Sequence, residues 1–343
     1  MLFDSLIGNS TVKTFISKLI REGRFPNSAI FAGPDGVGKK AFALEAAKTF
    51  VCSAEHGCGE CSACLRASRF NIAKPEKKDD FKDVFFSEHP DVGMVVPFNR
   101  NVLVDAIRRL EAEANYRPYE ARGRFFIIDD ADKMNDAASN ALLKTLEEPA
   151  PTSHIILITS RPDSLLQTIR SRSQTVRFSG IEHTEIEAHL AGGGQWKQPD
   201  AALAARTCGG SIARALSLDI EKFRQSRSTM LDVLDALSIK KVASVLQSSE
   251  RLNDAKNKDD LESNLVIMES LIRDAWLLKN GGAVSELTNC DVGRELSAIA
   301  SRLNAPTLAG WLGEVESMRG NFIVNINRKI ATDALFVKMA AGV

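Results

Sequence analysis

A glycine-rich segment near the N-terminus, residues 33–40 (GPDGVGKK), constrains the fold of this 343-residue chain more than any other feature. It follows a short apolar run, Ala29 to Ala32, that is typical of a buried strand, and it precedes a helical pattern from Ala41 to Phe50. Glycines let the backbone turn its N–H groups toward phosphate oxygens, and the N-terminus of the next helix adds partial positive charge. A strand, a glycine-rich turn and a helix in this order predict a phosphate-binding loop.

The residue types in this loop suggest which parts of a nucleotide they would contact. Gly33, Gly36 and Gly38 would form the phosphate cradle, and the ammonium group of Lys39 would contact the β- and γ-phosphates. The next position usually carries a Ser or Thr hydroxyl that helps to hold Mg²⁺, whereas this chain has Lys40 there. We therefore expect a pocket for ATP in which the residue that normally seats Mg²⁺ is altered.

A second apolar run, Arg124 to Asp129, ends in carboxylates. In nucleotide hydrolases with a phosphate loop, an acid at such a strand end holds Mg²⁺, and we assign this role to Asp129. Asp130 occupies the position where many such ATPases have Glu, and the lost methylene would move the carboxylate by about an ångström, which can cost on the order of a hundredfold in rate. Without the phosphate loop, an acidic turn after a core strand would be the simpler interpretation.

Four cysteines lie within a short segment in the pattern C-x5-C-x2-C-x2-C, at Cys52, Cys58, Cys61 and Cys64. Four thiolates at this spacing suit tetrahedral Zn²⁺, and disulfides are disfavoured in the cytosol. His56 could replace Cys52, and coincident free thiols are the alternative. Four protein ligands leave no position for a substrate, so the pattern predicts a structural zinc site.

The composition narrows the possible functions. Lys and Arg total 44, as do Asp and Glu, so no net charge draws the whole chain to nucleic acid or to a membrane. Any contact with DNA would be local or shared with partners. The N-terminus lacks the basic start and apolar stretch of a signal peptide, and no apolar run reaches transmembrane length. We expect a cytoplasmic protein without a membrane partner.

Apolar strands alternate with helical patterns as far as Ser179, which predicts a parallel sheet covered on both faces. Residues 1–179 would therefore form an α/β nucleotide-binding domain that contains the zinc module, residues 52–64. Residues 180–222 read as three short helices, and residues 223–343 as an all-α domain. The clearest helical stripe comprises Leu261, Leu265, Met268, Ile272 and either Ala275 or Trp276. The charge-rich residues 74–83 should form an exposed excursion.

Two charged segments allow more than one interpretation. The run NALLKTLEEP, residues 140–149, places two carboxylates at a helix C-terminus, where they oppose the helix dipole. They could face a partner or mark a solvated helix end. Ile169 to Ser173 contains Arg170 and Arg172, which could be surface charge or could project toward a neighbouring molecule.

These segments, taken in order, resemble the clamp loader subunits of bacterial DNA polymerase III, most closely the delta prime type. The resemblance is specific over roughly the first two thirds of the chain and rests on general helical character beyond. It implies an AAA+ domain, a three-helix lid and a helical collar that assembles a ring of subunits. The segments that carry it are residues 7–8 (IG), the phosphate loop, the cysteine module, residues 89–91 (HPD), residues 128–132 (IDDAD), the NALLKTLEEP run and residues 171–173 (SRS).

The resemblance also implies roles for individual residues. Arg172 would be an arginine finger that contacts ATP on the adjacent motor subunit, a contribution worth roughly a thousandfold or more in rate. Ser173 departs from the cysteine of the family pattern. Thr159 resembles the sensor residue near the γ-phosphate. Arg214 lies one position later than the lid arginine of motor subunits, and one helical position turns a side chain by about 100°.

The expected function is therefore that of a delta prime type assembly subunit. It would act with gamma/tau and delta subunits to load the sliding clamp onto primed DNA in an ATP-dependent complex. Lys40, Asp130 and Arg214 each depart from the pattern of an active motor, so its own ATPase activity should be weak or absent. The alternatives are an ATP-hydrolysing gamma/tau-type motor subunit and a stand-alone zinc-bearing AAA+ protein. A small-molecule kinase fits least.

Overall fold

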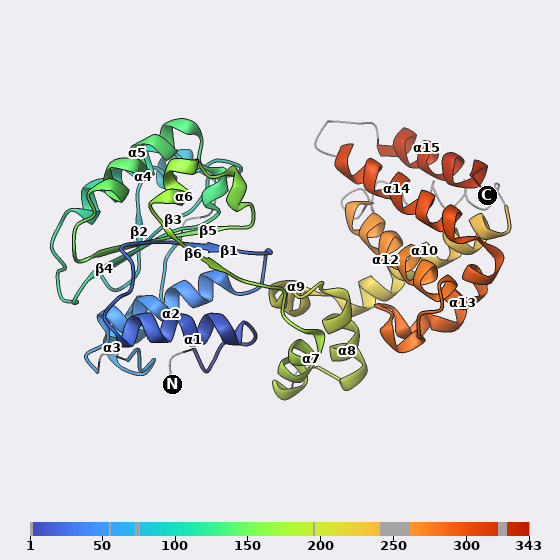
Figure 1. Cartoon of the computed structure of the whole chain (residues 1–343), viewed down its shortest axis with the longest axis horizontal. Coiled ribbons are helices and arrows are strands. Elements are labelled where there is room, and N and C mark those ends of the chain that lie inside the picture. The colour runs from blue at the N-terminus through green and yellow to red at the C-terminus, as the bar shows by residue number, and fades with distance from the viewer. Residues whose placement is uncertain are drawn as a thin grey trace. The chain divides into compact units, whose positions relative to one another are not determined.

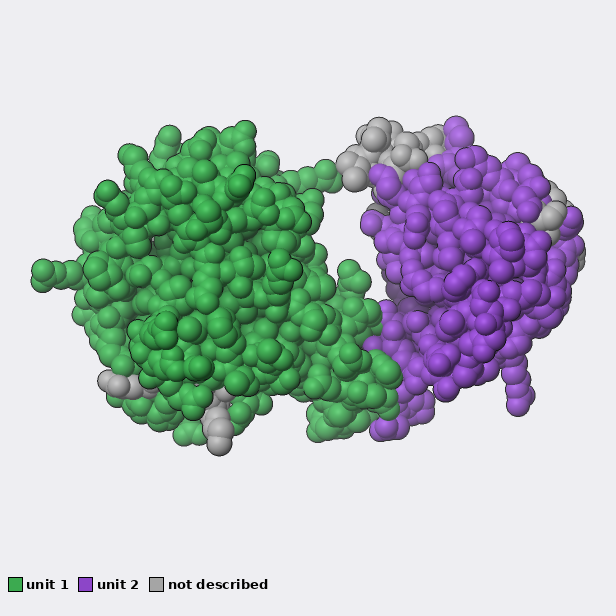
Figure 2. Space-filling view, in the orientation of Figure 1, with its two compact units in different colours: residues 1–197, 208–216 green, residues 198–207, 217–343 purple. Residues whose placement is uncertain are grey.

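The structure of the protein is a computed structural model that describes residues 3–54, 56–72, 74, 76–194, 196–240, 261–321 and 328–342. Its described residues form two compact units, coloured green and purple in Figure 2. Unit 1 comprises Met1–Lys197 and Cys208–Leu216, and unit 2 comprises Gln198–Thr207 and Ser217–Val343. Each unit has hydrophobic core residues of its own.

A mainly parallel sheet forms the centre of unit 1 (Figure 1). In the described part of the chain it has six strands in the spatial order β2-β3-β4-β5-β1-β6. β2 runs antiparallel to β3, and the other neighbouring strands run parallel to each other. The strands are β1 (Ser28–Ala32), β2 (Phe85–Phe86), β3 (Val92–Val95), β4 (Arg124–Ile128), β5 (Ser153–Thr159) and β6 (Gln174–Arg177). The predicted α/β class with a parallel sheet is confirmed in this form.

Helices cover both faces of the sheet (Figure 1). Side chains alternate across β1, so that Phe31 packs into the core on one face and Ile30 into the core on the other. Every residue of β1, β3, β4 and β5 is buried, because the two helical layers exclude water from both faces. One layer contains α1 (Ser10–Arg21), α2 (Lys39–Val51) and α3 (Ser62–Ala67), and the other contains α4 (Val104–Ala114), α5 (Asp136–Glu147) and α6 (Gln167–Ser171).

Short 3-10 segments connect some of these elements. They are η1 (Lys78–Phe81), η2 (Ala131–Lys133) and η3 (Pro162–Ser164) in unit 1, and η5 (Val284–Glu286) and η6 (Cys290–Val292) in unit 2. The described part of the predicted excursion at residues 74–83 is exposed except for Phe81, which is buried against the rings of Phe85 and Phe98. The excursion is therefore anchored to the domain by one aromatic side chain.

A buried ion pair supports the sheet where β3 and β4 begin. Asp91 and Arg124 are both fully buried, and the Nε atom of Arg124 lies 3.6 Å from Oδ1 of Asp91. The Asp91 carboxylate also accepts hydrogen bonds from the backbone N–H groups of Tyr119, Glu120 and Ala121, at 2.8, 3.0 and 3.0 Å. The Arg124 guanidinium donates to the backbone oxygen and the carboxylate of Glu113. Asp91 thereby ties the loop before β4 to the sheet.

Unit 2 is helical in its described residues, as expected for the C-terminal region (Figure 1). The stripe on α12 is buried, with Met268, Ile272 and Ala275 fully inaccessible, whereas Trp276 is partly exposed. An ion pair links two segments of this unit: the Arg227 guanidinium binds Asp291, at 2.5 Å. The helices are α10 (Ile220–Ser238), α12 (Leu261–Lys279), α13 (Gly293–Arg302), α14 (Ala305–Asn321) and α15 (Arg328–Ala341).

The three short helices predicted after the sheet are confirmed as α7 (His183–Gly192), α8 (Gln198–Thr207) and α9 (Ile212–Ser217). The division of the chain into residues 1–179, 180–222 and 223–343 stays a prediction. Among the described residues, no helix combines the length and the apolar character that crossing a membrane requires.

Candidate nucleotide-binding site and the Arg172 edge

The predicted phosphate loop joins the carboxyl end of β1 to the N-terminus of α2. Gly36 and Gly38 have φ values of 75° and 95°, a backbone region that favours glycine. At Gly36 a Cβ atom would lie 2.1 Å from Oγ of Ser211, and the Gly36 carbonyl accepts a hydrogen bond from the N–H of Ala213 at 3.1 Å. The start of α9 therefore packs closely against the loop, and Gly36 has both conformational and steric reasons to be glycine.

Lys39 is folded onto this loop. Its side chain is 6% exposed, and its Nζ atom donates to the carbonyl oxygens of Gly33 and Pro34 at 2.6 and 2.7 Å. Burial lowers the pKa of Lys39, and the nearby carboxylates of Asp35 and Asp130 partly oppose that shift. The ammonium group thus lies where the predicted phosphate contacts would be made.

The carboxylates that follow β4 each have a cationic partner within the chain. Oδ2 of Asp129 lies 2.9 Å from Nζ of Lys40, and Oδ2 of Asp130 lies 2.7 Å from Nζ of Lys133. Asp130 has a φ of 48°, so the backbone turns sharply at this residue. Two residues of the predicted metal site, Lys40 and Asp129, therefore contact each other directly, and Asp130 is paired with a lysine on η2.

Thr159 lies at the end of β5 and is fully buried. Its hydroxyl donates to Oδ1 of Asp132 at 2.8 Å and accepts from the N–H of Arg161 at 2.9 Å. The Arg161 guanidinium binds the same carboxylate, with Nη2 2.7 Å from Oδ2. Burial raises the pKa of the Asp132 carboxyl, but the hydrogen bonds from Arg161 and Thr159 outweigh it, so that the pKa is lowered overall. Asp132 and Arg161 were not predicted as site residues.

The sheet brings most of the predicted nucleotide residues to one edge. The N–H of Gly33 donates to the carbonyl of Thr159 at 3.2 Å, and Ala32 and Thr159 are paired between β1 and β5. The donor set, a glycine loop with two lysines, fits phosphate groups. It does not fit Mg²⁺ in the usual way, because position 40 offers an ammonium group in place of a hydroxyl oxygen and Asp129 is already bound to it.

Arg172 lies at the opposite end of β1. The hydroxyls of Ser28, at the start of β1, and Ser173 are 2.6 Å apart, whereas the phosphate loop begins after Ala32. A strand of this length spans about 16 Å at 3.3 Å per residue. The Arg172 side chain, 37% exposed, has Nη2 2.9 Å from Oε1 of Glu147 at the end of α5. The ion pair therefore connects the two charged segments, residues 140–149 and 169–173, whose roles the sequence left open.

A hollow of about 500 Å³ adjoins Arg172. Leu146 and Pro149 line it from the LLKTLEEP segment, and Asn27 lines it from the residues before β1. The amide of Asn27 donates to the carbonyl of Ser153 at 2.8 Å, which fixes that wall to β5. The arginine thus borders a concave surface whose walls come from three segments that are distant in the sequence.

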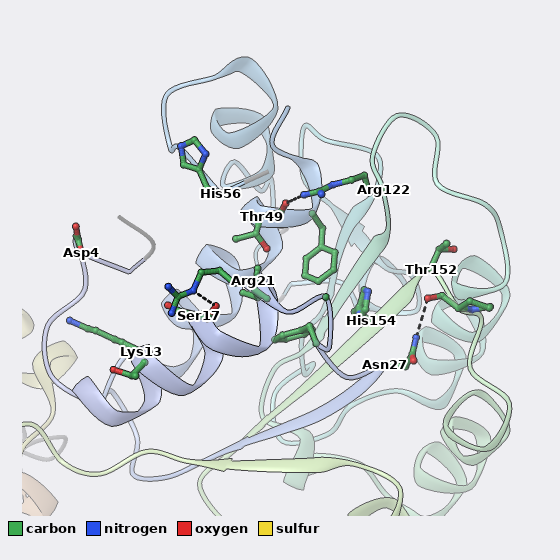
Figure 3. A pocket seen from close by; sticks show the side chains of 16 residues that line it. Asp4, Lys13, Ser17, Arg21, Asn27, Thr49, His56, Arg122, Thr152 and His154 are labelled. Atoms are coloured by element: carbon green, nitrogen blue, oxygen red, sulfur yellow. Dashed lines mark hydrogen bonds between the residues drawn. The ribbon is translucent and has the colours of Figure 1, made fainter. Parts of the chain in front are cut away.

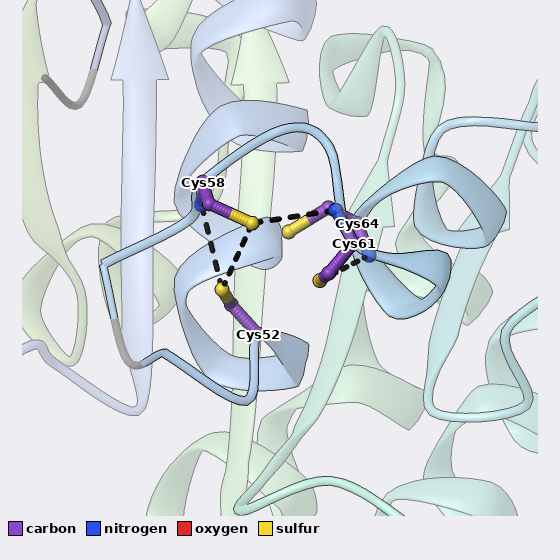
Figure 4. Close-up of side chains that lie close together, drawn as sticks. All are labelled: Cys52, Cys58, Cys61 and Cys64. Atoms are coloured by element: carbon purple, nitrogen blue, oxygen red, sulfur yellow. Dashed lines mark hydrogen bonds between the residues drawn. The ribbon is translucent and has the colours of Figure 1, made fainter.

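The four cysteines meet as the spacing predicts (Figure 4). Their Sγ atoms all lie within 4.8 Å of one another, and those of Cys52 and Cys58 are 3.6 Å apart. The backbone N–H groups of Cys61 and Cys64 donate to the Sγ atoms of Cys58 and Cys61, respectively. Burial raises the pKa of Cys52, but hydrogen bonds from the backbone of Cys58 and Ala54 outweigh it and bring the pKa to about 6. Such a cluster could bind a metal ion.

His56 is not part of this cluster. Its ring is exposed, and Nδ1 lies 2.7 Å from the carbonyl oxygen of Ala54. The sequence allowed either Cys52 or His56 as the fourth ligand, and the side chain that lies with the other three cysteines is Cys52.

A cavity of about 1110 Å³ that was not predicted lies near the amino ends of β4 and β5 (Figure 3). Basic side chains of Lys13, Arg21 and Arg122 line it, and so does the ring of His154. The Arg122 guanidinium donates to the carbonyl of Thr49 at 2.7 Å. The phosphate loop contributes no lining residue. Because the walls come from separate segments, no local sequence motif could have indicated this cavity.

A glycine-rich loop at the carboxyl edge of a mainly parallel sheet is the arrangement typical of P-loop domains. The chain belongs to the DNA polymerase III delta-subunit family: the family model described as "DNA polymerase III, delta subunit" matches residues 8–182. The model described as "DNA polymerase III, delta subunit, C terminal" matches residues 221–336. The family on which the sequence resemblance rested is therefore confirmed.

Two relatives are delta' subunits of DNA polymerase III. The protein of Bacillus subtilis (strain 168) is 30% identical over 223 residues, which are 65% of this chain and 63% of that protein. The protein of Escherichia coli (strain K12) is 27% identical over 327 residues, which are 92% of this chain and 90% of that protein. A crystal structure of a DNA polymerase III gamma subunit-related protein from Thermotoga maritima is 17% identical, with a TM-score of 0.44 over 95% of this chain and 98% of that chain.

Proposed function

We propose that this protein is a delta prime type subunit of a bacterial clamp loader. It acts with gamma/tau and delta subunits in an ATP-dependent complex that loads the sliding clamp onto primed DNA, and it works in the cytoplasm. Membership of the delta-subunit family and relatives with delta' names support this proposal. The contact with DNA is made through the assembled complex, in keeping with a chain of no net charge.

The position of Arg172 is the observation that carries the proposal. The arginine is partly exposed near the start of β1, about one strand length from the chain's own phosphate loop, and this separation supports a role toward a nucleotide on another subunit. A guanidinium at the γ-phosphate stabilises the charge that develops on the transferring phosphoryl group. Arg172 acts in this role as the arginine finger of a neighbouring motor subunit.

The chain's own site is a nucleotide site of the AAA+ type with little or no hydrolysis. Gly33, Gly36, Gly38 and Lys39 hold the phosphates of ATP. Hydrolysis is impaired because Asp129 is paired with Lys40 and Asp130 with Lys133, while the hydroxyl of Thr159 is bound to Asp132. The carboxylates that would hold Mg²⁺ and polarise water are occupied by cations of the same chain.

The cysteine module holds a structural Zn²⁺ ion through Cys52, Cys58, Cys61 and Cys64. The four sulfur atoms are close enough to share one ion, and Cys52 follows α2 directly. The metal would fix the C-terminal end of the helix whose N-terminal end carries Lys39. Metal analysis of protein purified without chelator should find one zinc per chain, and its absence would remove this assignment.

The remaining architecture follows the same family pattern. We assign residues 1–179 to the AAA+ domain, residues 180–222 to a lid and residues 223–343 to a collar that joins the subunits. The three short helices and the helical unit 2 support this assignment.

DNA-stimulated ATP hydrolysis tests the proposal in four preparations: this protein alone, a reconstituted loader that contains it, and that loader with Arg172→Ala or Arg170→Ala. We expect no turnover by the isolated chain, activity in the complex, and a loss of about a thousandfold at the one site that Arg172 completes. Arg170 lies on α6, two positions before Arg172, and binds Asp163, so its replacement is a matched control with little effect. Strong turnover by the isolated chain would instead indicate a gamma/tau-type motor.

A further inference from the structure

Lys40 occupies the position of the hydroxyl that normally helps to seat Mg²⁺, and its ammonium group is bound to the carboxylate that normally holds the same ion. We propose that the phosphate loop of this chain binds a nucleoside triphosphate without a divalent cation, with the Lys40 ammonium in the place of the metal. The proposal rests on the part of the proposed function that assigns a nucleotide to Gly33–Lys39. It is independent of the role of Arg172.

The geometry of the Lys40 pair is that of a cation between two elements. Lys40 belongs to the first turn of α2, directly after the loop, and Asp129 follows the end of β4. Nζ of Lys40 and Oδ2 of Asp129 are 2.9 Å apart, a charge-assisted hydrogen bond. In a metal-dependent site, Mg²⁺ would connect these two positions through a hydroxyl and a carboxylate or water. Here a covalently attached cation makes the connection.

The surrounding charges disfavour an additional divalent cation. Asp129, Asp130 and Asp132 are already paired with Lys40, Lys133 and Arg161. A metal ion would have to displace Lys40 from Asp129 and then remain near the displaced ammonium group. A polyphosphate has the opposite charge, so it is attracted by Lys39 and Lys40 together. The electrostatics of the site therefore suit the anion without its metal.

The same ion pair could instead block the site, but its exposure argues against this. The side chain of Lys40 is 42% exposed and that of Asp129 is 21% exposed. Pairs of this kind contribute little to stability, and a phosphate oxygen, unlike a cation, can bind the ammonium group without separating it from Asp129. An incoming phosphate oxygen can therefore share the Lys40 ammonium with Asp129. A nucleotide held in this way stays intact, because no metal ion neutralises the developing charge and no free carboxylate polarises water.

The decisive experiment measures the equilibrium binding of ATP to the full-length wild-type protein by calorimetry, once with excess Mg²⁺ and once with excess EDTA. We expect the two dissociation constants to agree within about threefold. Analysis of the bound nucleotide after prolonged incubation should find ATP and no ADP. An affinity that falls by about tenfold or more in EDTA would overturn the proposal and leave the role of Arg172 untouched.

Lys40→Thr restores the hydroxyl and removes the ammonium group. This variant should bind ATP about tenfold or more weakly in EDTA than in Mg²⁺, whereas Lys48→Thr, on the same helix, should behave as the wild type because Lys48 binds Glu45. If Lys40→Thr fails to fold, the ATP affinities of the wild-type protein in Mg²⁺ and in EDTA still test the proposal. Absence of ATP binding under both conditions would overturn this proposal together with the nucleotide assignment. The loader experiment with Arg172→Ala would then still test the subunit role.

Discussion

The two ends of β1 carry the two charged sites of unit 1, and their side chains are partnered in different ways. At the carboxyl end, the three carboxylates that follow β4 are each paired with a cation of the same chain. At the amino end, Arg172 has one partly exposed carboxylate partner, Glu147. At the first end the carboxylates expected to hold Mg²⁺ are paired with cations, whereas at the second a partly exposed arginine is paired with a single carboxylate.

Under the proposed function, this difference would let one fold lose one activity and keep another. Hydrolysis needs several groups at once, so a few substitutions that pair its carboxylates are enough to stop it. An arginine that serves a neighbour needs only a fixed backbone position and access to solvent. The glycine-rich loop, which the proposed function needs for nucleotide binding, is retained.

The largest expected effect comes from Asp91→Ala, which would disturb the sheet that both ends share. Removing Asp91 takes one of two carboxylate partners from the buried Arg124, the other being Glu113, and leaves three backbone N–H groups without their acceptor. Breaking a buried pair in this way typically costs about 3–5 kcal/mol. Urea denaturation should show this loss in the free energy of unfolding of unit 1. Asp83→Ala, which removes the exposed partner of Arg109, should cost about 1 kcal/mol or less. Equal effects of the two variants would contradict the structural role of Asp91.

A smaller effect is expected from acidification. Burial lowers the pKa of His154 from its usual value of 6.5, and the bond to the Pro26 carbonyl only partly opposes this. Below 6.5 the unfolded chain binds a proton that the folded protein does not, so stability falls with pH by up to about 1.4 kcal/mol per unit until the folded pKa is reached. Urea denaturation between about pH 7.5 and about pH 5.5 should show this slope.

Two variants identify the group responsible for that slope. His154→Phe should reduce it, because a phenyl ring fits beside Phe25 and Phe50 and does not titrate, and the buried His89, whose pKa is also lowered by burial, accounts for a remaining slope. His56→Ala should leave it unchanged, since the His56 ring is exposed. An unchanged slope in His154→Phe would assign the effect to other groups. Variants at the two ends of β1 are best compared at a pH above this range, where the protonation of His154 does not lower the stability of the folded protein.

The smallest effect is expected from Glu147→Gln, which tests how Arg172 is held. A partly exposed ion pair contributes about 0.2–1 kcal/mol, so the ATPase rate of the reconstituted loader should fall by at most about fivefold. Glu148→Gln, at the next position, should have no effect on this rate. A rise in rate with Glu147→Gln would mean that the carboxylate restrains the arginine and does not position it.

Local patterns predicted the elements of this protein well. The apolar runs at β1 and β4, the cysteine cluster and the stripe on α12 were all visible because each depends on neighbours in the sequence. The glycine-rich turn also lies where the sequence predicted it, between β1 and α2, and its role as a phosphate loop stays a prediction. The two-residue strand β2 was missed, since a run that short has no periodicity.

Side-chain partners were less predictable, because they join residues that only the tertiary fold brings together. Lys40 and Asp129 are 89 positions apart, and the sequence could not decide whether Lys40 would turn to solvent or toward the metal position. The pairing of Glu147 with Arg172 and of Thr159 with Asp132 has the same origin. The cavity beside His154 was missed for this reason as well.

The separation of Arg172 from the phosphate loop also gives unit 1 a polarity. Subunits that join by placing such an arginine against the next phosphate loop form a head-to-tail series, in which every contact pairs two different surfaces. A member that supplies an arginine completes the ATPase site of its neighbour. If its own site hydrolyses no ATP, it needs no arginine from another subunit. Such a member is suited to the terminus of the series, where it distinguishes the beginning of the assembly from its end.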